Sequence, residues 1–356
     1  MILRVPDYYK DFKCIAGNCS DSCCAGWEID IDQDSAEYYC QVEGEFGDRL
    51  REKLQTLEDG EHCFKLTPNG RCPFLNDDNL CDIIINLGEE AISEVCTEYP
   101  RFCIEYSNVV HKFYSLSCEE VGRIVFNLER KVGFVDIEMP DACCYEENEN
   151  VQMDEEEIQF AYNTMLESIK ILQNREITIG DRIRQYLDYV EEAHNKLNHI
   201  AGLSIQEAAI NEDEIATASE RFYPFTQMVV INEEWNGVRK RLESYSDEEL
   251  AELVKVFMQS SDYKELDYEQ LMVYFTFRYL MNCVYDKDLK SYAKLSVLFT
   301  LVIRDMDAVR FKENGGHFER KDRVDTARIF SKEVEHSEEN NDLVLEEIPF
   351  MLPLVW

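Results

Sequence analysis

Cysteine is the residue type in this chain with the most capacity for chemistry, and it is concentrated near the N-terminus. Eleven of the 14 cysteines lie in the first 118 residues, and the run CIAGNCSDSCC contains Cys14, Cys19, Cys23 and Cys24. Thiolates are soft ligands that favour zinc, copper(I) or iron–sulfur chemistry. A loop this short brings several of them to one centre at little entropic cost, so the run predicts a metal or iron–sulfur site.

The spacing of these cysteines leaves the identity of the centre open. The CxxC…CxxC spacing of many zinc sites is absent, and so is the CxxxCxxC pattern of radical adenosylmethionine enzymes. Iron–sulfur ligation tolerates more varied spacing. Cys23 and Cys24 are adjacent and point in different directions on most backbones, so both are ligands only if they serve different metals or a cluster of several irons. Structural zinc and loosely buried cysteines remain the alternatives.

Further cysteines extend the candidate set. Cys72 and Cys81 flank a turn in GRCPFLNDDNLCDI, Cys96 lies in VCTEYPR and Cys118 in SLSCEE. We interpret Cys40, Cys63, Cys103 and the pair Cys143–Cys144 as core or incidental. The predicted metal ligands are therefore Cys14, Cys19, Cys23, Cys24, Cys72, Cys81, Cys96 and Cys118.

The elements that must position these cysteines divide the chain in two. With 356 residues it is long enough for two domains, and its composition changes near residue 144. We expect a cysteine-rich metal or cluster domain over residues 1–144 and a mainly helical domain over 145–356, with the acidic segment YEENENVQMDEEE as a linker or solvated helix start. The predicted fold class is mainly α, a helical bundle after the cysteine-rich domain, without a Rossmann sheet.

Hydrophobic periodicity supports helices in the second part. Apolar residues recur at steps of three and four from Ile158 to Leu172 and again from Ile183 to Ala193. Ser246 and Glu249 form a capping-box pattern. The segments 271–285 and 292–306 predict two buried helices joined by an Asp-Lys-Asp turn. The apolar last stretch, residues 348–356, is expected to pack on the body of the protein.

Net charge and hydropathy exclude several function classes. The formal net charge is −37, from 73 acidic and 36 basic residues, which disfavours a nucleic-acid partner. There is no signal-peptide pattern and no apolar stretch of about 18 residues. We therefore expect a cytoplasmic protein with no membrane partner, in which the cysteines are not a disulfide framework. An acidic surface attracts cationic partners such as lysine side chains.

At this point the residues resemble a known family. The segments PDYYKDFKC, CSDSCCAGWEIDID, GRCPFL, LCDI, CTEYPR and SLSCEE, in that order, are similar to the N-terminal region of flagellin lysine-N-methylases. That region is related to a wider group of zinc- or iron-chelating cysteine-cluster domains. VYFTFRYL and FSKEVEHSEEN resemble C-terminal helical segments of the same family, whereas residues 140–260 match only loosely.

The resemblance implies an enzyme that transfers methyl groups from S-adenosylmethionine to lysine ε-amines of flagellin. It also implies an iron–sulfur cluster on the N-terminal cysteines, which favours a 4Fe–4S cluster over zinc. Four thiolates saturate such a cluster, so eight candidates imply two centres or a different role for some cysteines. The alternative function is a metal-binding or redox-sensing protein whose helical half binds a partner. The oligomeric state stays open.

The residues that would perform methyl transfer are harder to predict. The chain contains no GxG, so the common glycine-rich nucleotide turn is missing and the cluster becomes a candidate participant in binding S-adenosylmethionine. Lysine must lose its proton before it attacks the methyl group. Asp7, Tyr8, Tyr9 and Tyr99 lie near the cysteines in sequence, although aromatic packing is the plainer interpretation. We expect Arg101 in an ordinary salt bridge and His336 on a solvated helix face.

Overall fold

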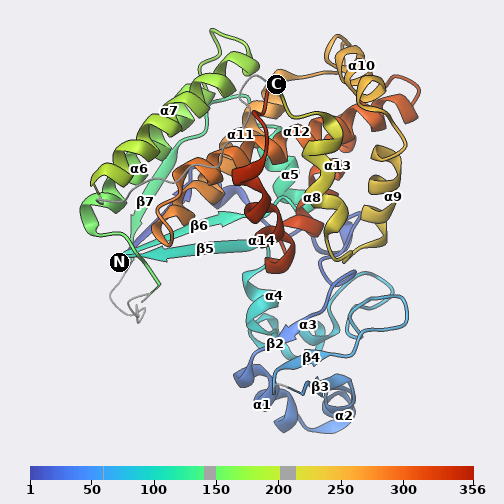
Figure 1. Cartoon of the computed structure of the whole chain (residues 1–356). Coiled ribbons are helices and arrows are strands. Elements are labelled where there is room, and N and C mark those ends of the chain that lie inside the picture. The colour runs from blue at the N-terminus through green and yellow to red at the C-terminus, as the bar shows by residue number, and fades with distance from the viewer. Residues whose placement is uncertain (59, 140–149, 201–213) are drawn as a thin grey trace.

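The computed structural model describes residues 1–58, 60–139, 150–200 and 214–356. Cys143, Cys144, the expected boundary at 144/145 and the first part of the expected linker lie outside these ranges. Figure 1 shows a small lobe below a larger, mainly helical body. We define the small lobe as residues 27–98 and the cysteine loop as residues 14–24.

The small lobe is built on a three-stranded antiparallel sheet of order β2-β4-β3. Short helices cover it, and its own hydrophobic core contains Tyr39, Phe64 and Phe74. Asp32 caps α1 by accepting from the backbone N–H of Ser35. Its elements are α1 (Gln33–Gln41), α2 (Gly44–Lys53), α3 (Asp82–Leu87), α4 (Glu94–Glu98), β2 (Asp30–Ile31), β3 (Leu54–Thr56) and β4 (His62–Phe64).

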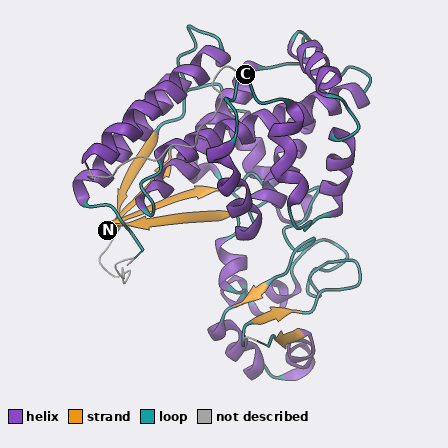
Figure 2. Cartoon of the chain, in the orientation of Figure 1, coloured by secondary structure: helices purple, strands orange, loops and turns teal. Residues whose placement is uncertain are grey.

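A second sheet lies in the body, and the sequence interpretation did not include it. Its order is β5-β6-β1-β7; β1 pairs parallel with β6, and the other pairs are antiparallel. Figure 2 shows how small both sheets are beside the helices, so the prediction of a mainly α chain is confirmed. The strands are β1 (Ile2–Pro6), β5 (Arg101–Tyr106), β6 (Val109–Tyr114) and β7 (Phe134–Glu138).

The helices of the body confirm the sequence periodicity. The apolar face from Ile158 to Leu172 is buried on α6, and the Ser246–Glu249 capping box begins α10. The body's helices are α5 (Glu119–Phe126), α6 (Glu155–Leu172), α7 (Ile179–Ile200), α8 (Ala218–Gln227), α9 (Glu233–Leu242), α10 (Asp247–Met258), α11 (Glu265–Tyr279), α12 (Leu289–Glu313), α13 (Arg320–Val334) and α14 (Glu338–Glu347).

Helices α11 and α12 form the buried centre of the body, as expected for the two most apolar segments. Nearly every residue of α11 is buried, and a short 3-10 turn, residues 280–284, leads toward α12. The C-terminal stretch packs on the body, where Ile348 and Leu354 are buried and Trp356 contacts Tyr268. No helix in the described ranges has the length and apolarity needed to cross a membrane.

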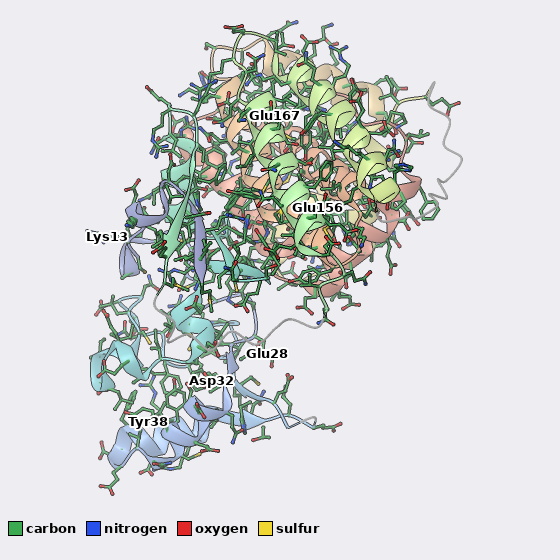
Figure 3. The ribbon with its side chains drawn as sticks, turned by 90° about the vertical axis from the view of Figure 1, so that its left-hand side faces the viewer. Lys13, Glu28, Asp32, Tyr38, Glu156 and Glu167 are labelled. Atoms are coloured by element: carbon green, nitrogen blue, oxygen red, sulfur yellow. The ribbon has the colours of Figure 1, made fainter. Side chains whose placement is uncertain are left out.

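One hydrophobic core joins sequence regions from both sides of the expected domain boundary. Side chains of β5, β6 and α5 pack in the same core as α6 to α13, and His111 on β6 lies with its ring centroid 4.1 Å from that of Phe277 on α11. The small lobe has a separate core. Figure 3 shows Asp32 and Tyr38 in that lobe, away from Glu156 and Glu167 on α6.

Candidate metal centre and the junction beside it

The cysteine loop is held against two helices of the body. Glu119, the first residue of α5, accepts from both the backbone N–H and the hydroxyl of Ser20 through Oε2, at 2.6 and 2.7 Å. Asp21 accepts from Arg328 at 2.7 Å and from Lys332 at 3.0 Å, and both cations are on α13. The positions of the loop thiols are therefore tied to α5 and α13.

Three of the predicted ligands gather where the loop meets α5. Cys118 directly precedes α5, and the Ser20–Glu119 bonds bring Cys19 beside it. The pKa of Cys19 is raised to about 12, mainly by burial, with the neighbouring Cys118 and Cys14 contributing. Burial raises the pKa of Cys118 to about 11, with Cys14 again contributing. These thiols are close enough for the charge of one to disfavour ionisation of the next.

Four other predicted ligands gather in the small lobe. The backbone N–H of Cys72 donates to the carbonyl oxygen of Cys24 at 2.7 Å, and Leu75 pairs with Cys81 in a β-bridge. Cys72 belongs to the core of the small lobe, and Cys24 and Cys81 pack against that core. The pKa of Cys72 is raised to about 12, mainly by burial, with the neighbouring thiols Cys24, Cys96 and Cys81 contributing. Cys96 in turn has Cys24 and Cys81 as neighbours.

Cys23 lies between the thiols beside α5 and the thiols of the small lobe. Its hydrogen bond to Cys24 is the largest cause of the raised pKa of Cys23, and the same bond lowers the pKa of Cys24 to about 7. Cys96 and Cys14, one from each gathering, also raise the pKa of Cys23. Its carbonyl oxygen accepts from the indole N–H of Trp27 at 2.8 Å, which fixes the backbone at this point.

Backbone N–H groups favour the thiolate at several of these positions. Cys81 and Cys118 each directly precede a helix, and the first-turn N–H groups oppose the rise that burial causes in each pKa. At Cys72, the N–H of Phe74 does the same. Burial outweighs these N–H groups, so the pKa of each of the three thiols remains raised.

The donor chemistry fits a thiolate-ligated group. All eight predicted ligands are free thiols, and each is the residue type that holds iron–sulfur clusters or structural zinc. Across the described ranges, no three His, Cys, Asp or Glu side chains form a ready site for a single metal ion. The ligand assignment therefore stays a prediction.

The remaining described cysteines lie elsewhere. Cys63 is buried in β4, where the side-chain amide of Gln55 donates to its sulfur at 2.9 Å, and Cys283 is buried in the body. Cys40 and Cys103 are exposed.

Four partly exposed aromatic side chains meet beside the loop, and we call them the junction group: Trp27, Tyr99, Phe102 and His336. Ring centroids of Trp27 and Phe102 each lie 4.8 Å from that of His336. Tyr99 lies 5.7 Å from Trp27, and the charges of Cys118 and Cys23 act on its hydroxyl. The junction group thus joins the small lobe, β5 and the end of α13 at the cysteine site.

The structure contradicts the prediction that His336 lies on a solvated face. Its Nε2 is 2.9 Å from Ser115 Oγ and 2.8 Å from Ser117 Oγ. Burial, together with the cations Arg278 and Lys332, lowers the pKa of His336 to about 3, so the ring is neutral at physiological pH.

The acidic run around His336 misled the sequence interpretation because its carboxylates have buried partners. Glu333 accepts from the backbone N–H groups of Ile231 and Asn232. Glu335 accepts from the hydroxyls of Tyr274 and Tyr279 and pairs with Arg278. These partners come from distant segments, so nothing in the local sequence signalled them.

Cations lie beneath the junction group despite the acidic composition of the chain. The guanidinium carbon of Arg278 is 3.9 Å from the ring centroid of Phe102, and Nζ of Lys332 is 4.7 Å from that of Trp27. Lys332 is only 2% exposed at its side chain. Each of these cations is ion-paired, Arg278 with Glu335 and Lys332 with Asp21.

Most of the other residues singled out from the sequence pack away from the junction group. Asp7 pairs with Arg130 and accepts from the N–H of Gly133, and Tyr8 is buried in the body. Tyr9 stacks on Tyr114 with ring centroids 4.6 Å apart. Aromatic packing is therefore the observed role of the two adjacent tyrosines.

Arg101 is also structural, although not in the expected way. Its guanidinium lies 5.6 Å from the ring of Phe12 and 5.5 Å from that of Tyr114, and it donates to the carbonyl oxygens of Thr97 and Glu98. Cation–π contacts and carbonyl acceptors thus take the place of the predicted salt bridge.

A cavity of about 270 Å³ opens among α8, α9, α10 and α12. Phe222, Tyr223 and Tyr245 supply aromatic walls, and Asp247 and Asp305 supply carboxylates. The volume is near the lower end of small-molecule sites, which span about 300–1,000 Å³. It is a second place where a small ligand could be held.

Comparison with known proteins assigns the class. The model of the FliB lysine N-methylase C-terminal domain matches residues 166–350, which include the cavity and the α13 residues that hold the cysteine loop. The chain therefore belongs to the FliB lysine N-methylase family. No solved structure matches it.

Individual relatives match a shorter stretch. The chain is 30% identical over 127 residues to the flagellar biosynthetic protein FliU of Salmonella muenchen, covering 34% of this chain and 75% of that protein. It is 30% identical over 137 residues to the lysine-N-methylase of Salmonella typhimurium strain LT2, covering 34% of this chain and 32% of the relative. A lysine-N-methylase of Salmonella choleraesuis is 29% identical over 135 residues. The match thus spans about a third of the length of these lysine-N-methylases.

Proposed function

We propose that this protein transfers methyl groups from S-adenosylmethionine to lysine ε-amines of flagellin, and that an iron–sulfur centre on its N-terminal cysteines is required. Membership of the FliB lysine N-methylase family supports the methyl transfer, and the flagellar name of one relative supports the substrate. When bound, the centre would supply a thiolate-ligated iron–sulfur group next to the junction group. The predicted ligands fit such a centre in number and donor type.

The observation that carries this proposal is the contact between the cysteine loop and α13. Arg328 and Lys332 lie in the segment that matches the family's C-terminal domain, and both bind Asp21 between Cys19 and Cys23. The thiol-rich region and the family domain therefore adjoin each other at this contact. This placement supports a role for the cysteines in the activity of the helical domain.

The junction group is the proposed place for the acceptor lysine. Its partly exposed rings offer apolar surface for the methylenes of a lysine side chain, next to the thiols. An ammonium group would be disfavoured there, because burial and the cations Arg278 and Lys332 already hold His336 neutral. The same surroundings would lower the pKa of an entering lysine, so that it arrives as the nucleophilic neutral amine.

Charge would act on the substrate in two steps, first at long range on the approaching protein and then locally on its lysine. The net charge of −37 attracts a lysine-bearing partner from solution, at a rate that falls as salt is added. Close to the site, the buried cations favour loss of the proton to water. This division explains why a strongly acidic protein would keep Lys332 and Arg278 beside its aromatic surface.

The direct test is mass spectrometry of flagellin incubated with anaerobically purified protein and S-adenosylmethionine. We expect mass increments of about 14 Da on lysine, which disappear without the methyl donor. Trp27→Ala should raise KM for flagellin, because it removes a ring of the junction group. Tyr38→Ala is the control: it removes an exposed ring of the small lobe far from the site and should leave KM unchanged. Unmodified flagellin with metal-loaded protein would refute the proposal.

A further inference from the structure

The eight predicted ligands fall into two sets in space. Cys118 packs against the core of the large body, whereas Cys72 belongs to the core of the small lobe, with Cys24 and Cys81 packed against it. The two cores share no residue. A single four-iron group that drew ligands from both would have to bridge two separately packed units.

Hydrogen bonds place four of the eight thiols, two in each set. On the body side, the Ser20–Glu119 bonds bring together the residues that follow Cys19 and Cys118. On the lobe side, the Cys72 N–H to Cys24 carbonyl bond joins two members of the other set. Beside these bonds, Cys24, Cys96 and Cys81 are the thiols that raise the pKa of Cys72, and Cys14 is the thiol that raises the pKa of Cys118, whereas thiols of both sets raise the pKa of Cys23.

Cys23 and Cys24 are where the two sets meet. Consecutive α-carbons are about 3.8 Å apart, so neighbouring residues can supply one thiolate each to two centres on opposite sides of the chain. Cys24 belongs with the small lobe through its bond to Cys72. Cys23 then completes the body-side set, and Tyr99 is near both Cys23 and Cys118.

We propose that the chain binds two separate 4Fe–4S clusters, one on Cys14, Cys19, Cys23 and Cys118, and one on Cys24, Cys72, Cys81 and Cys96. Four thiolates saturate each cluster. This inference rests on the proposed iron–sulfur centre and specifies its number and ligands. The first cluster lies at the junction group beside α5 and α13, and the second lies inside the small lobe.

The two clusters differ in what they hold together. The body-side cluster joins the cysteine loop to Cys118 before α5, so it fixes the loop on the domain that matches the family model. The lobe-side cluster joins Cys24, the segment at Cys72, the residue before α3 and the middle of α4, so it holds the small lobe together. Loss of the second should loosen residues 27–98 and leave the body folded.

The test is iron and sulfide analysis of the full chain, purified and reconstituted without oxygen. We expect about eight irons and eight sulfides in the wild type, and about four of each in Cys118→Ser and in Cys72→Ser. Combining the two substitutions should remove nearly all iron. Cys103→Ser is the matched control, because Cys103 is exposed on β5 and outside both sets, and it should keep about eight irons.

Spectroscopy of the reduced protein gives a second readout that does not depend on activity. With ligands on adjacent residues, the two reduced clusters should interact magnetically, giving a broadened electron paramagnetic resonance spectrum that integrates to about two spins per chain. Each single variant should give one spin with a simple, uncoupled spectrum. Circular dichroism and gel filtration identify a variant that lost iron by unfolding, and Cys14→Ser and Cys81→Ser then replace it.

Several results would overturn this proposal. A wild-type content of about four irons contradicts it, as does loss of all iron in both single variants of folded protein. Two zinc ions per chain would refute the iron–sulfur assignment. If eight irons are found but flagellin is not methylated, the proposed function fails while the two-cluster inference stands.

Discussion

Lys332 and Asp21 are 311 positions apart in the chain, yet Nζ of Lys332 donates to Oδ2 of Asp21 at 3.0 Å. The same ammonium donates to the carbonyl oxygen of Ala25 at 2.8 Å. One buried side chain of α13 therefore fixes both ends of the segment that carries Cys23 and Cys24.

Replacing Lys332 should loosen the cysteine loop. Lys332→Met keeps the packing volume but leaves Asp21 with Arg328 alone, so we expect a loss of about 1–3 kcal/mol in the free energy of unfolding. Urea denaturation of the metal-free protein measures this loss, and iron content after reconstitution should fall with it. Lys170→Met, which breaks an exposed pair on α6, is the control. Equal stability of the two variants would show that the Asp21 contact contributes nothing.

Enlarging Gly122 should separate the two helices that hold the loop. A Cβ at this position would lie 3.0 Å from Cγ1 of Val324, so α5 and α13 are in close contact here. Gly122→Val should cost about 1–3 kcal/mol through overpacking and displace Cys118. Thermal unfolding checks the stability. Gly122→Val combined with Val324→Ala should recover part of the loss, and failure of that rescue would indicate a cause other than this contact.

His336 should affect methyl transfer more than folding. His336→Asn removes the ring that contacts Trp27 and Phe102, and we expect kcat/KM for flagellin to fall at least about tenfold. His317→Asn, at a side chain that is 81% exposed, should leave kcat/KM unchanged.

Lys332 is proposed to keep the acceptor amine neutral. If it does, Lys332→Arg should preserve the acid limb of the pH–rate profile, and Lys332→Met should move that limb to higher pH. An unmoved limb would exclude that role.

His111 should make the folded protein sensitive to acid. Its Nε2 is 2.9 Å from the carbonyl oxygen of Phe277 and its Nδ1 is 3.2 Å from the hydroxyl of Tyr106, and burial lowers its pKa to about 3. The unfolded chain binds this proton near the ordinary value of about 6.5. Its contribution to stability is therefore full above pH 6.5 and is lost as the pH falls toward 3.

Urea midpoints at pH 7 and pH 4.5 test this linkage. Between pH 6.5 and pH 4.5, about two pH units, the wild type should lose roughly 2–3 kcal/mol of unfolding free energy through His111. His111→Gln should therefore show a smaller drop in stability between pH 7 and pH 4.5 than the wild type. The exposed His317→Gln should show the wild-type drop. An identical pH dependence in all three proteins would mean that His111 does not contribute.

Binding of S-adenosylmethionine should distinguish its two candidate locations. If the centre participates, Cys19→Ser should weaken binding about tenfold (about 1.4 kcal/mol) in calorimetry, whereas Tyr223→Ala in the cavity should not. We expect that outcome because the junction group and the thiols adjoin each other. The reverse pattern would place the methyl donor in the cavity between α8 and α10.

The helices of the second half were predictable because their signals are local. The buried stripe of α6, the capping box of α10 and the apolar segments of α11 and α12 each reside in one continuous stretch. The four-stranded sheet was missed because its β1 strand comes from residues 2–6 while its partners lie at 109–114 and 134–138. The β5–β6 hairpin is local in sequence and β6 alternates in burial, but β1 and β7 are short and show no such alternation.

By itself, the sequence determined that the chain is mainly helical, rich in thiol donors near its N-terminus and a member of one methylase family. Only the tertiary structure decided that the cysteine loop is held against α5 and α13 and that His336 is packed against Trp27, Phe102 and two serines. The physical reason is that the sequence gives the separation of two thiols along the chain but not their distance in space. Which of them meet depends on where two separate hydrophobic cores and the Asp21–Lys332 contact hold the backbone.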